Sequence, residues 1–430
     1  MKHKGMVAAL SCAFGASMLA YRPTVMQTMP TMVQALGLGP EEGGKLLSLG
    51  ATVYMVCKPS AQVISDSVEA RTMLILSVTL SGILFLAIGM SSALWQIQLC
   101  FAAVHITQAM HSPAMLALVG RTFAPKERGT PLSIINSSGN AVNSFIPLLV
   151  TATLRWSGGQ WRIVFLTQGA ACALAGIMLA PVVLRFAVPA ALPLGGAAAA
   201  AAGKPTAGPA TAASTAAAAS STRTTLGGVA RRGEIWLLGF SSTALYVVRF
   251  GIEAWLASYL AQGTTKEAGA SAAAVFLFWW QAGGFFGSLA AGPVSDSLLG
   301  GARAPLVVAC ATALVGGLSV LPRLGGAAAA SWALSAVGAL CGACVFGQRT
   351  LMTLCTREQV PPDAGGKADA IVNLLAELGG VIAGLPLIRL VNHLGWSVYV
   401  PALRFAALVM VGAGLWLHVR PASSASKKVG

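Results

Sequence analysis

Long apolar stretches separated by short polar segments run along most of the chain. Twelve of them are long enough for a helix that crosses a bilayer, which needs roughly 20 mostly apolar residues. Strands of a membrane barrel would instead show about ten residues of alternating polarity. The predicted helices cover 5–30, 43–65, 72–91, 94–120, 130–154, 161–185, 234–261, 270–295, 304–322, 328–355, 368–391 and 397–419. The pattern therefore predicts an all-α membrane protein with twelve transmembrane helices.

One segment interrupts this pattern between the sixth and seventh predicted helices. Residues 187–233 consist largely of Ala, Gly, Ser, Thr and Pro, a low-complexity composition typical of a linker. We therefore expect an N-terminal six-helix bundle over 1–186, a disordered cytoplasmic linker over 187–233, a C-terminal six-helix bundle over 234–420 and a cytoplasmic tail over 421–430.

Charge is scarce in this chain and unevenly placed. Charged residues make up 10% of it and hydrophobic residues 56%, whereas a soluble domain carries about 25% charged residues. This excludes a soluble enzyme and a nucleic-acid binder with a soluble core. Basic residues outside the predicted helices lie mostly on the side of the N-terminus, and those on the opposite side are Lys45, Arg155, Arg162, Lys266 and Arg323. The positive-inside rule then places both termini in the cytoplasm.

The two halves resemble each other in parallel order. The sequence VISDS around Asp66 recurs as PVSDS around Asp296, and GGQW ending at Trp161 recurs as HLGW ending at Trp396. The recurring Asp is expected to cap or pair near a helix end, or to lie in a solvated turn. Two six-helix halves related about an axis along the membrane normal are the architecture of major facilitator transporters, whose substrate site lies at the midplane between them. We therefore predict the major facilitator fold, with two pseudo-symmetric six-helix bundles.

Three basic residues lie deep inside predicted helices. Arg22 and Arg249 occupy corresponding places in the first and seventh helices, and Lys58 lies in the second. A charge at a helix centre costs about 2.5–3.5 kcal/mol on insertion scales, so such residues should face a cavity or a partner. Two guanidinium groups on opposite walls of a cavity would suit a tetrahedral oxyanion. The arrangement predicts an anionic substrate, most simply phosphate or a phosphate ester.

Other interpretations of these cations remain open. Arg249 could instead pair with Glu253, one helical turn away. Arg22 or Lys58 could extend to a membrane interface.

Two further charged residues lie within predicted helices of the C-terminal half. Arg349 could line the cavity or mark the cytoplasmic end of the tenth helix. Glu377, in the eleventh, could pair with a cavity cation, carry a proton or make a structural hydrogen bond.

At this point the residues show a resemblance to a family. The stretch YVVRFGIEAWLASYL, residues 246–260, resembles the seventh helix of the organophosphate:phosphate antiporters, which include bacterial glycerol-3-phosphate and hexose-phosphate transporters. Tyr246, Arg249 and Trp255 stand at that family's spacing. The resemblance extends over nearly the whole chain outside the linker.

The N-terminal half carries matching motifs. Arg22 stands eight residues before Pro30 in RPTVMQTMP, which is similar to an Arg ahead of a Met-Pro pair in the family. Tyr54 and Lys58 in YMVCK match a Tyr-x-x-x-Lys of the family's site.

The resemblance implies that Arg22 and Arg249 bind phosphate, that Lys58 supports them, and that an organic phosphate is exchanged for inorganic phosphate by alternating access. We also expect an empty site to bring two unpaired like charges together, which would give obligatory exchange a physical basis. The expected substrate-binding residues are Arg22, Arg249, Lys58, Tyr54, Tyr246, Asn140 and Trp255.

The chain departs from the family at an imidazole position. The family's fifth helix carries a His in the site, whereas Asn140 stands at the aligned position here. His105 and His111 in the fourth helix could replace that imidazole, or could be packed or interfacial residues. Substrate identity and coupling therefore do not transfer with the resemblance.

No nucleotide-binding Gly loop, metal cluster or catalytic triad stands out in the sequence. We expect no enzyme activity, no cofactor, no metal and no nucleic-acid partner. The expected partners are a small phosphorylated anion, inorganic phosphate and the lipid bilayer, with the protein a monomer. Two other functions remain open: a non-transporting sensor or receptor of the same fold, and a carrier of another anion or a neutral solute. The membrane could be a plasma membrane or an organelle envelope.

Overall fold

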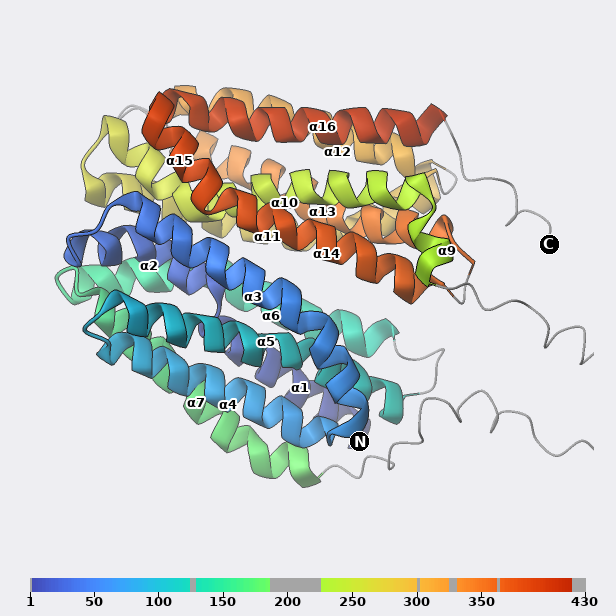
Figure 1. Ribbon diagram of the computed structural model, residues 1–430, viewed down its shortest axis with the longest axis horizontal. Coiled ribbons are helices and arrows are strands. Elements are labelled where there is room, and N and C mark those ends of the chain that lie inside the picture. Colours follow the sequence, from blue (N-terminus) through green and yellow to red (C-terminus); the bar gives the residue numbers. More distant parts are fainter. Residues whose placement is uncertain are drawn as a thin grey trace, which may run out of the picture.

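The computed structural model describes residues 2–123, 129–185, 226–299, 302–324, 331–361 and 364–419. Within these ranges the secondary structure is helical, with no strand (Figure 1). The N-terminal half contains α1 (Lys2–Leu19), α2 (Arg22–Ala35), α3 (Pro40–Ser67), α4 (Ala70–Met90), α5 (Leu94–Thr122), α6 (Gly129–Trp156) and α7 (Trp161–Arg185). The C-terminal half contains α9 (Leu226–Ala230), α10 (Gly233–Leu260), α11 (Lys266–Leu298), α12 (Arg303–Val320), α13 (Ser331–Glu358), α14 (Gly365–Ala383), α15 (Leu385–Leu394) and α16 (Tyr399–Val419).

Each predicted transmembrane stretch coincides with one long helix or with two consecutive helices. Nine helical segments of the described chain are long and apolar enough to cross a membrane, with α1 and α2 counted together and α14 and α15 counted together. The more polar helices α3, α5 and α6 fall outside that group, so the number twelve stays a prediction. Most of the predicted linker lies outside the described residues, and its final part contains α9.

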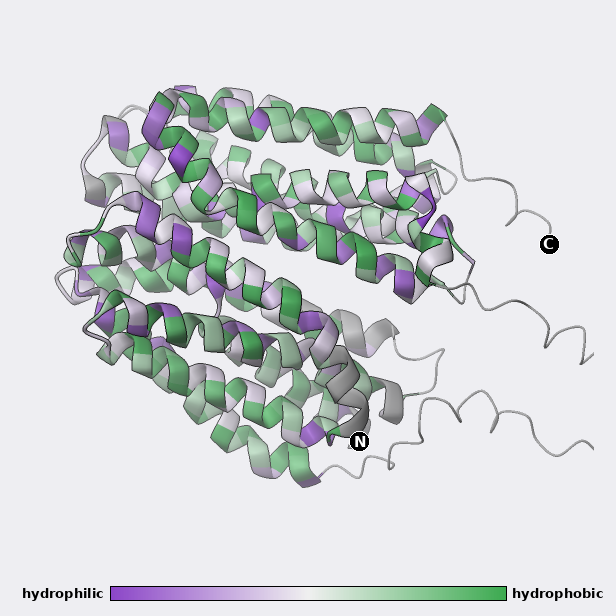
Figure 2. Cartoon of the chain, viewed as in Figure 1, coloured by the Kyte–Doolittle hydropathy of each residue, from purple (hydrophilic) through white to green (hydrophobic). Residues whose placement is uncertain are grey.

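The surface agrees with a membrane environment. Figure 2 shows largely hydrophobic helices, with many of the strongly hydrophilic residues near the helix ends. Large apolar side chains such as Leu76, Phe286 and Phe405 point outward and are exposed. Water would not favour so many exposed apolar side chains on one molecule. The chain is an integral, multi-pass membrane protein.

Two of the predicted helices are broken. The first divides into α1 and α2 at Ala20 and Tyr21, and Tyr21 has an extended backbone. Pro23 is the second residue of α2; it cannot donate a backbone hydrogen bond and is well tolerated in the first turn of a helix. The break makes Arg22 the first residue of α2.

The second break lies between α14 and α15, where Gly384 and then Pro386 interrupt the helix. A Cβ on Gly384 would lie 2.8 Å from the Gly44 carbonyl oxygen of α3, so glycine permits this close approach between the halves. The Ser48 hydroxyl of α3 donates to the Val381 carbonyl at 2.8 Å and accepts from the Leu385 amide at 2.9 Å. The Leu385 amide is in the first turn of α15, where the helix offers no partner, and the Val381 carbonyl also accepts from the Gly384 amide at 3.2 Å.

The two halves meet most closely at one end of the molecule. There α3 contacts α14 and α15, and Arg389 pairs with Glu41 at 3.5 Å. In Figure 1 the bundles diverge toward the other end, where α1 begins, α7 and α16 end, and α9 lies. The halves also pack along α6 and α11, where the Phe145 and Phe278 rings are 5.6 Å apart.

The loop around Asp296, one of the two repeated loops, contains the expected ion pair near a helix end. Asp296, near the end of α11, pairs with Arg303 at the start of α12, with an N–O distance of 2.6 Å. The side chain of Asp66, its counterpart, lies outside the described residues.

Candidate functional site

Arg22 lies at the break between α1 and α2 and is 3% exposed. Its Nε donates to Nε2 of His105 at 2.9 Å, and its Nη1 donates to Oε2 of Glu377 at 3.0 Å. The remaining nitrogen, Nη2, is buried and has no hydrogen-bond partner. A buried donor left unsatisfied is costly in a folded protein. This nitrogen is therefore a natural position for a ligand oxygen.

The geometry of His105 shows that its ring is neutral. Nε2 accepts a hydrogen bond from Arg22 and so carries no proton, while Nδ1 lies 2.9 Å from the Phe101 carbonyl and donates to it. The His105 ring is fully buried and packs closely against Gly50 of α3. A Cβ on Gly50 would lie 2.6 Å from Cε1 of the ring, so the close contact requires glycine there. His105 thus supplies an imidazole in the site. His111 lies apart, with its Nδ1 3.2 Å from the Ser77 hydroxyl.

Arg249 has a carboxylate partner from its own helix, α10. Its Nε donates to Oε1 of Glu253 at 3.2 Å. The same oxygen accepts from Nε1 of Trp280 at 3.3 Å and from Nε2 of Gln281 at 3.1 Å, both on α11. The pairing with Glu253 that the sequence left open is therefore present.

These contacts overturn one expectation. Arg22 and Arg249 do not face each other as unpaired charges, because Glu377 neutralises the first and Glu253 the second. The reason is the high cost of an uncompensated charge in a low-dielectric interior. Glu377 is thus confirmed as the partner of a cavity cation.

The two arginines nevertheless converge on one aromatic ring. Cζ of Arg22 lies 5.1 Å from the Phe250 ring centroid, and Cζ of Arg249 lies 5.3 Å from it. Contacts at this distance fall within the range of cation–π attraction. No hydrogen bond within the described residues occupies either Nη atom of Arg249, so its outer fork can bind a ligand as Nη2 of Arg22 can. Sequence reasoning missed Phe250, since a Phe in an apolar run carries no distinguishing signal.

Two tyrosines surround these cations. The Tyr54 ring centroid lies 4.9 Å from Cζ of Arg22 and 5.2 Å from Nζ of Lys58. The Tyr246 ring lies 5.9 Å from Cζ of Arg249. The structure therefore brings these four predicted residues and Lys58 into one cluster of alternating cations and rings.

The other two predicted site residues lie elsewhere. Trp255 is 2% exposed, and its Nε1 donates to the Ala383 carbonyl at 2.8 Å, where α14 ends. It stabilises the break between α14 and α15. Asn140 is half-buried on α6, and no described hydrogen bond joins its side chain to the arginines.

Glycines let α14 bring Glu377 close to this cluster. A Cβ on Gly379 would collide with the Thr243 carbonyl of α10 and lie 2.7 Å from Cβ of Tyr246. A Cβ on Gly380 would lie 3.1 Å from the Phe250 ring. Larger residues would therefore push α14, with Glu377, away from α10.

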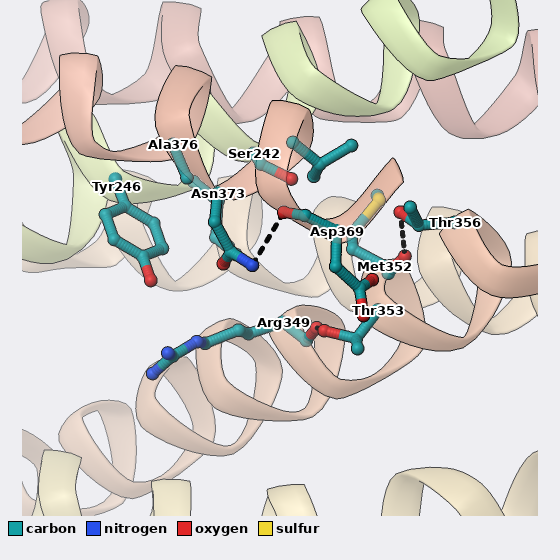
Figure 3. A pocket seen from close by; sticks show the side chains of 11 residues that line it. Ser242, Tyr246, Arg349, Met352, Thr353, Thr356, Asp369, Asn373 and Ala376 are labelled. Carbon is teal, nitrogen blue, oxygen red and sulfur yellow. Dashed lines mark hydrogen bonds between the residues drawn. The ribbon is translucent and has the colours of Figure 1, made fainter. Parts of the chain in front are cut away.

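A hollow in the C-terminal half adjoins the cluster at Tyr246 (Figure 3). It encloses about 310 Å³, part of it open solvent, and α10, α13 and α14 line it. Its polar wall is formed by Ser242, Tyr246, Arg349, Thr353, Thr356, Asp369 and Asn373. It lies toward the end of the molecule at which the halves diverge.

The helical fold, two bundles and central polar cluster correspond to one group of known proteins. The family model of the Major Facilitator Superfamily matches residues 6–384. The chain belongs to the Major Facilitator Superfamily. A solved structure of the same fold is that of a bacterial homologue of the human lysosomal transporter Spinster, inward-facing and unoccupied. It has a TM-score of 0.68 at 14% identity and covers 97% of this chain and 95% of that one.

Within this superfamily, similar proteins include a membrane sensor and transporters named for phosphorylated compounds. The membrane sensor protein UhpC of Escherichia coli is 28% identical over 85% of this chain and 80% of its own. A probable hexose phosphate transport protein of Chlamydia trachomatis is 25% identical over 89% and 83%. The hexose-6-phosphate:phosphate antiporter of Escherichia coli is 32% identical over 42% of this chain and 39% of its own. The resemblance to the organophosphate:phosphate antiporter family is thereby confirmed.

Proposed function

We propose that this protein is a secondary active transporter of organic phosphate anions, of the glycerol-3-phosphate or sugar-phosphate type, which it exchanges for inorganic phosphate. The observation that carries the proposal is the pair of arginines from different halves that flank Phe250. Among the described residues, Nη2 of Arg22 and both Nη atoms of Arg249 have no hydrogen-bond partner. A phosphoryl group has three oxygens that match such donors.

The charge of the site supports an anionic substrate. The cluster and the adjoining hollow wall hold four cations, Arg22, Lys58, Arg249 and Arg349, and two carboxylates that pair with the arginines, Glu253 and Glu377. A third carboxylate on the wall, Asp369, is neutralised by Arg357. With His105 neutral, their formal charges leave two positive charges. A phosphate monoester carries close to two negative charges at neutral pH. A neutral solute would leave this excess uncompensated.

We explain phosphate exchange by competition between the substrate and Glu377, in place of the repulsion between two unpaired arginines that the sequence led us to expect. In the empty protein Glu377 supplies the negative charge at Arg22, across the boundary between the halves. An arriving phosphoryl group competes with Glu377 for that guanidinium and binds Arg249 at the same time. Its oxygens then connect the two halves, and the halves rock about the bound anion, as in alternating access. Lys58 and the Tyr54 and Tyr246 rings support this binding.

The orientation is part of the proposal. Both termini lie in the cytoplasm, in agreement with the distribution of basic residues. The hollow beside Tyr246 then faces the cytoplasm, and the closed end at Ser48 and Glu41 faces the other side. The carrier works as a monomer in a lipid bilayer and needs no cofactor.

Phosphate counterflow tests the proposal. Purified protein is reconstituted into vesicles loaded with phosphate, and uptake of labelled phosphate is measured for the wild type, Arg22→Gln and Arg249→Gln. Hydrogen bonds to charged groups contribute about 1.5–3 kcal/mol, so each variant should bind phosphate about 10- to 100-fold more weakly. Wild-type exchange by both variants would refute the proposed site.

The similarity to a membrane sensor defines a second candidate. A sensor would bind phosphorylated ligands, with the same loss in Arg22→Gln and Arg249→Gln, but would show no counterflow. A carrier of another anion or of a neutral solute would show counterflow that glycerol 3-phosphate and hexose phosphates do not inhibit.

A further inference from the structure

Arg349 on α13 stands one aromatic ring away from the phosphoryl site. Its Cζ lies 5.7 Å from the centroid of the Tyr246 ring, and Cζ of Arg249 lies 5.9 Å from the same centroid. The Arg349 side chain is exposed and lines the hollow between α10, α13 and α14. Figure 3 shows its guanidinium group extending toward Tyr246.

No carboxylate in the described residues forms an ion pair with Arg349. Asp369, which lines the same hollow, pairs with Arg357 at 2.8 Å. In Figure 3 the Asp369 carboxylate lies away from the Arg349 guanidinium. Glu377 is bound to Arg22. A charged side chain within a membrane helix without an internal partner points to a ligand.

The rest of the wall is suited to a small hydroxylated molecule. Ser242, Thr353 and Asn373 place hydroxyl and amide groups around the hollow. Nδ2 of Asn373 donates to the Asp369 carbonyl at 2.8 Å, which leaves its Oδ1 as an acceptor. The hollow is partly open to solvent, so a ligand can reach these groups.

We propose that Arg349 binds a carboxylate on the organic part of the substrate, so that the carrier prefers small phosphorylated carboxylic acids to phosphorylated alcohols. The inference rests on the proposed function, because it takes Arg22 and Arg249 as the phosphoryl ligands. A planar guanidinium fork matches a carboxylate with two parallel hydrogen bonds.

The phosphoryl end and the carboxylate end of such a substrate can bind at Phe250 and at Arg349, with Tyr246 between them. The phosphoryl group binds at Phe250 between Arg22 and Arg249. The carbon chain crosses the Tyr246 ring, which both Arg249 and Arg349 face. The carboxylate then reaches Arg349, and a hydroxyl group on the chain donates to Oδ1 of Asn373.

A matched pair of ligands isolates the carboxylate. Glycerol 3-phosphate and 3-phosphoglycerate differ in a hydroxymethyl group replaced by a carboxylate. The inhibition constant of each is measured against labelled phosphate exchange in vesicles that contain the full chain. We expect 3-phosphoglycerate to bind about tenfold more tightly than glycerol 3-phosphate, the gain of one charge-assisted contact.

Variants at Arg349 decide the assignment. Arg349→Gln should weaken 3-phosphoglycerate far more than glycerol 3-phosphate and bring the ratio of the two constants close to one, while Arg349→Lys should retain part of the preference. Lys45→Gln removes one positive charge at the opposite end of the molecule, and it should leave the ratio and phosphate exchange unchanged. A wild-type ratio near one, or an unchanged ratio in Arg349→Gln, would overturn the inference.

The two proposals fail in different ways. A wild-type ratio near one, or an unchanged ratio in Arg349→Gln, with intact phosphate exchange contradicts the Arg349 subsite alone. Absence of phosphate exchange in the wild type contradicts the transport function, and the ratio is then obtained from the thermal stabilisation that each ligand gives the purified protein. An equal stabilisation by both ligands would refute the subsite in that case as well.

Discussion

The two arginines of the site differ in where their counter-charges come from. Arg249 pairs with Glu253 one turn along α10, and Trp280 and Gln281 of the same half hold that carboxylate. Arg22 pairs with Glu377, which belongs to the other half of the molecule, 355 residues further along the chain. One charge pair is therefore internal to a bundle, and the other joins two bundles.

This difference separates a fixed part of the site from a changeable part. The group formed by Arg249, Glu253, Trp280 and Gln281 moves with its bundle and keeps its geometry when the halves rock. The bond between Arg22 and Glu377 must lengthen or re-form when they do, since its two ends lie on different bundles. The C-terminal half thus offers a prebuilt anion site, and the charge at Arg22 responds to substrate and to conformation.

The largest effect is expected from removal of the fixed carboxylate. Glu253→Ala leaves Arg249 without its counter-charge and leaves two buried donors, Trp280 and Gln281, unsatisfied. Breaking a buried charge pair costs about 3–5 kcal/mol. The variant should therefore have a much lower Tm in detergent, measured by thermal unfolding of the purified protein.

Two further variants test whether Glu253 and Glu377 differ in their contribution to stability. Glu253→Gln keeps one acceptor oxygen and should lose less stability than Glu253→Ala. Glu377→Ala should also lose less, because separation of the halves can hydrate Arg22, whereas Trp280 and Gln281, the donors to Glu253, are buried within one half. Equal losses in Glu253→Ala and Glu377→Ala would show that the two carboxylates are equivalent.

The smallest effect is expected at Trp255, which shares α10 with Arg249. Trp255→Phe removes one hydrogen bond to the Ala383 carbonyl and should lower stability by about 1 kcal/mol. Phosphate affinity, measured on the purified variant by titration, should change less than twofold. A loss of affinity as large as that of Arg249→Gln would place Trp255 among the ligands, as its family spacing predicts.

The fold was predictable because its signals are local and repeated. Apolar runs gave the helices, and the recurring Asp296 and Trp396 motifs gave the duplication. The breaks at Tyr21 and Gly384 were not foreseen, because each lies within an apolar run and depends on packing. Pro23 and Pro386, close to the breaks, were visible signals, but a proline in a membrane helix often does no more than bend it.

The sequence predicted the cationic residues of the site better than the carboxylates that pair with them. Arg22, Arg249 and Lys58 stand out because charge is costly inside a membrane. The partner of Arg22 could not be read from the sequence, since Glu377 lies in a different half and reaches it only through the packing of α14 at Gly379 and Gly380. Glu253 was recognisable from its helical spacing alone.

The central claim is that phosphate and Glu377 compete for Arg22. Phosphate Kd is measured by titration of the purified wild type, Glu377→Gln, Arg22→Gln and the double variant. Removal of the competing carboxylate should tighten phosphate binding about tenfold, or about 1.4 kcal/mol. The same change in the Arg22→Gln background should have an effect of at most twofold. Weaker phosphate binding in Glu377→Gln, or equal tightening without the Arg22 guanidinium, would contradict the account.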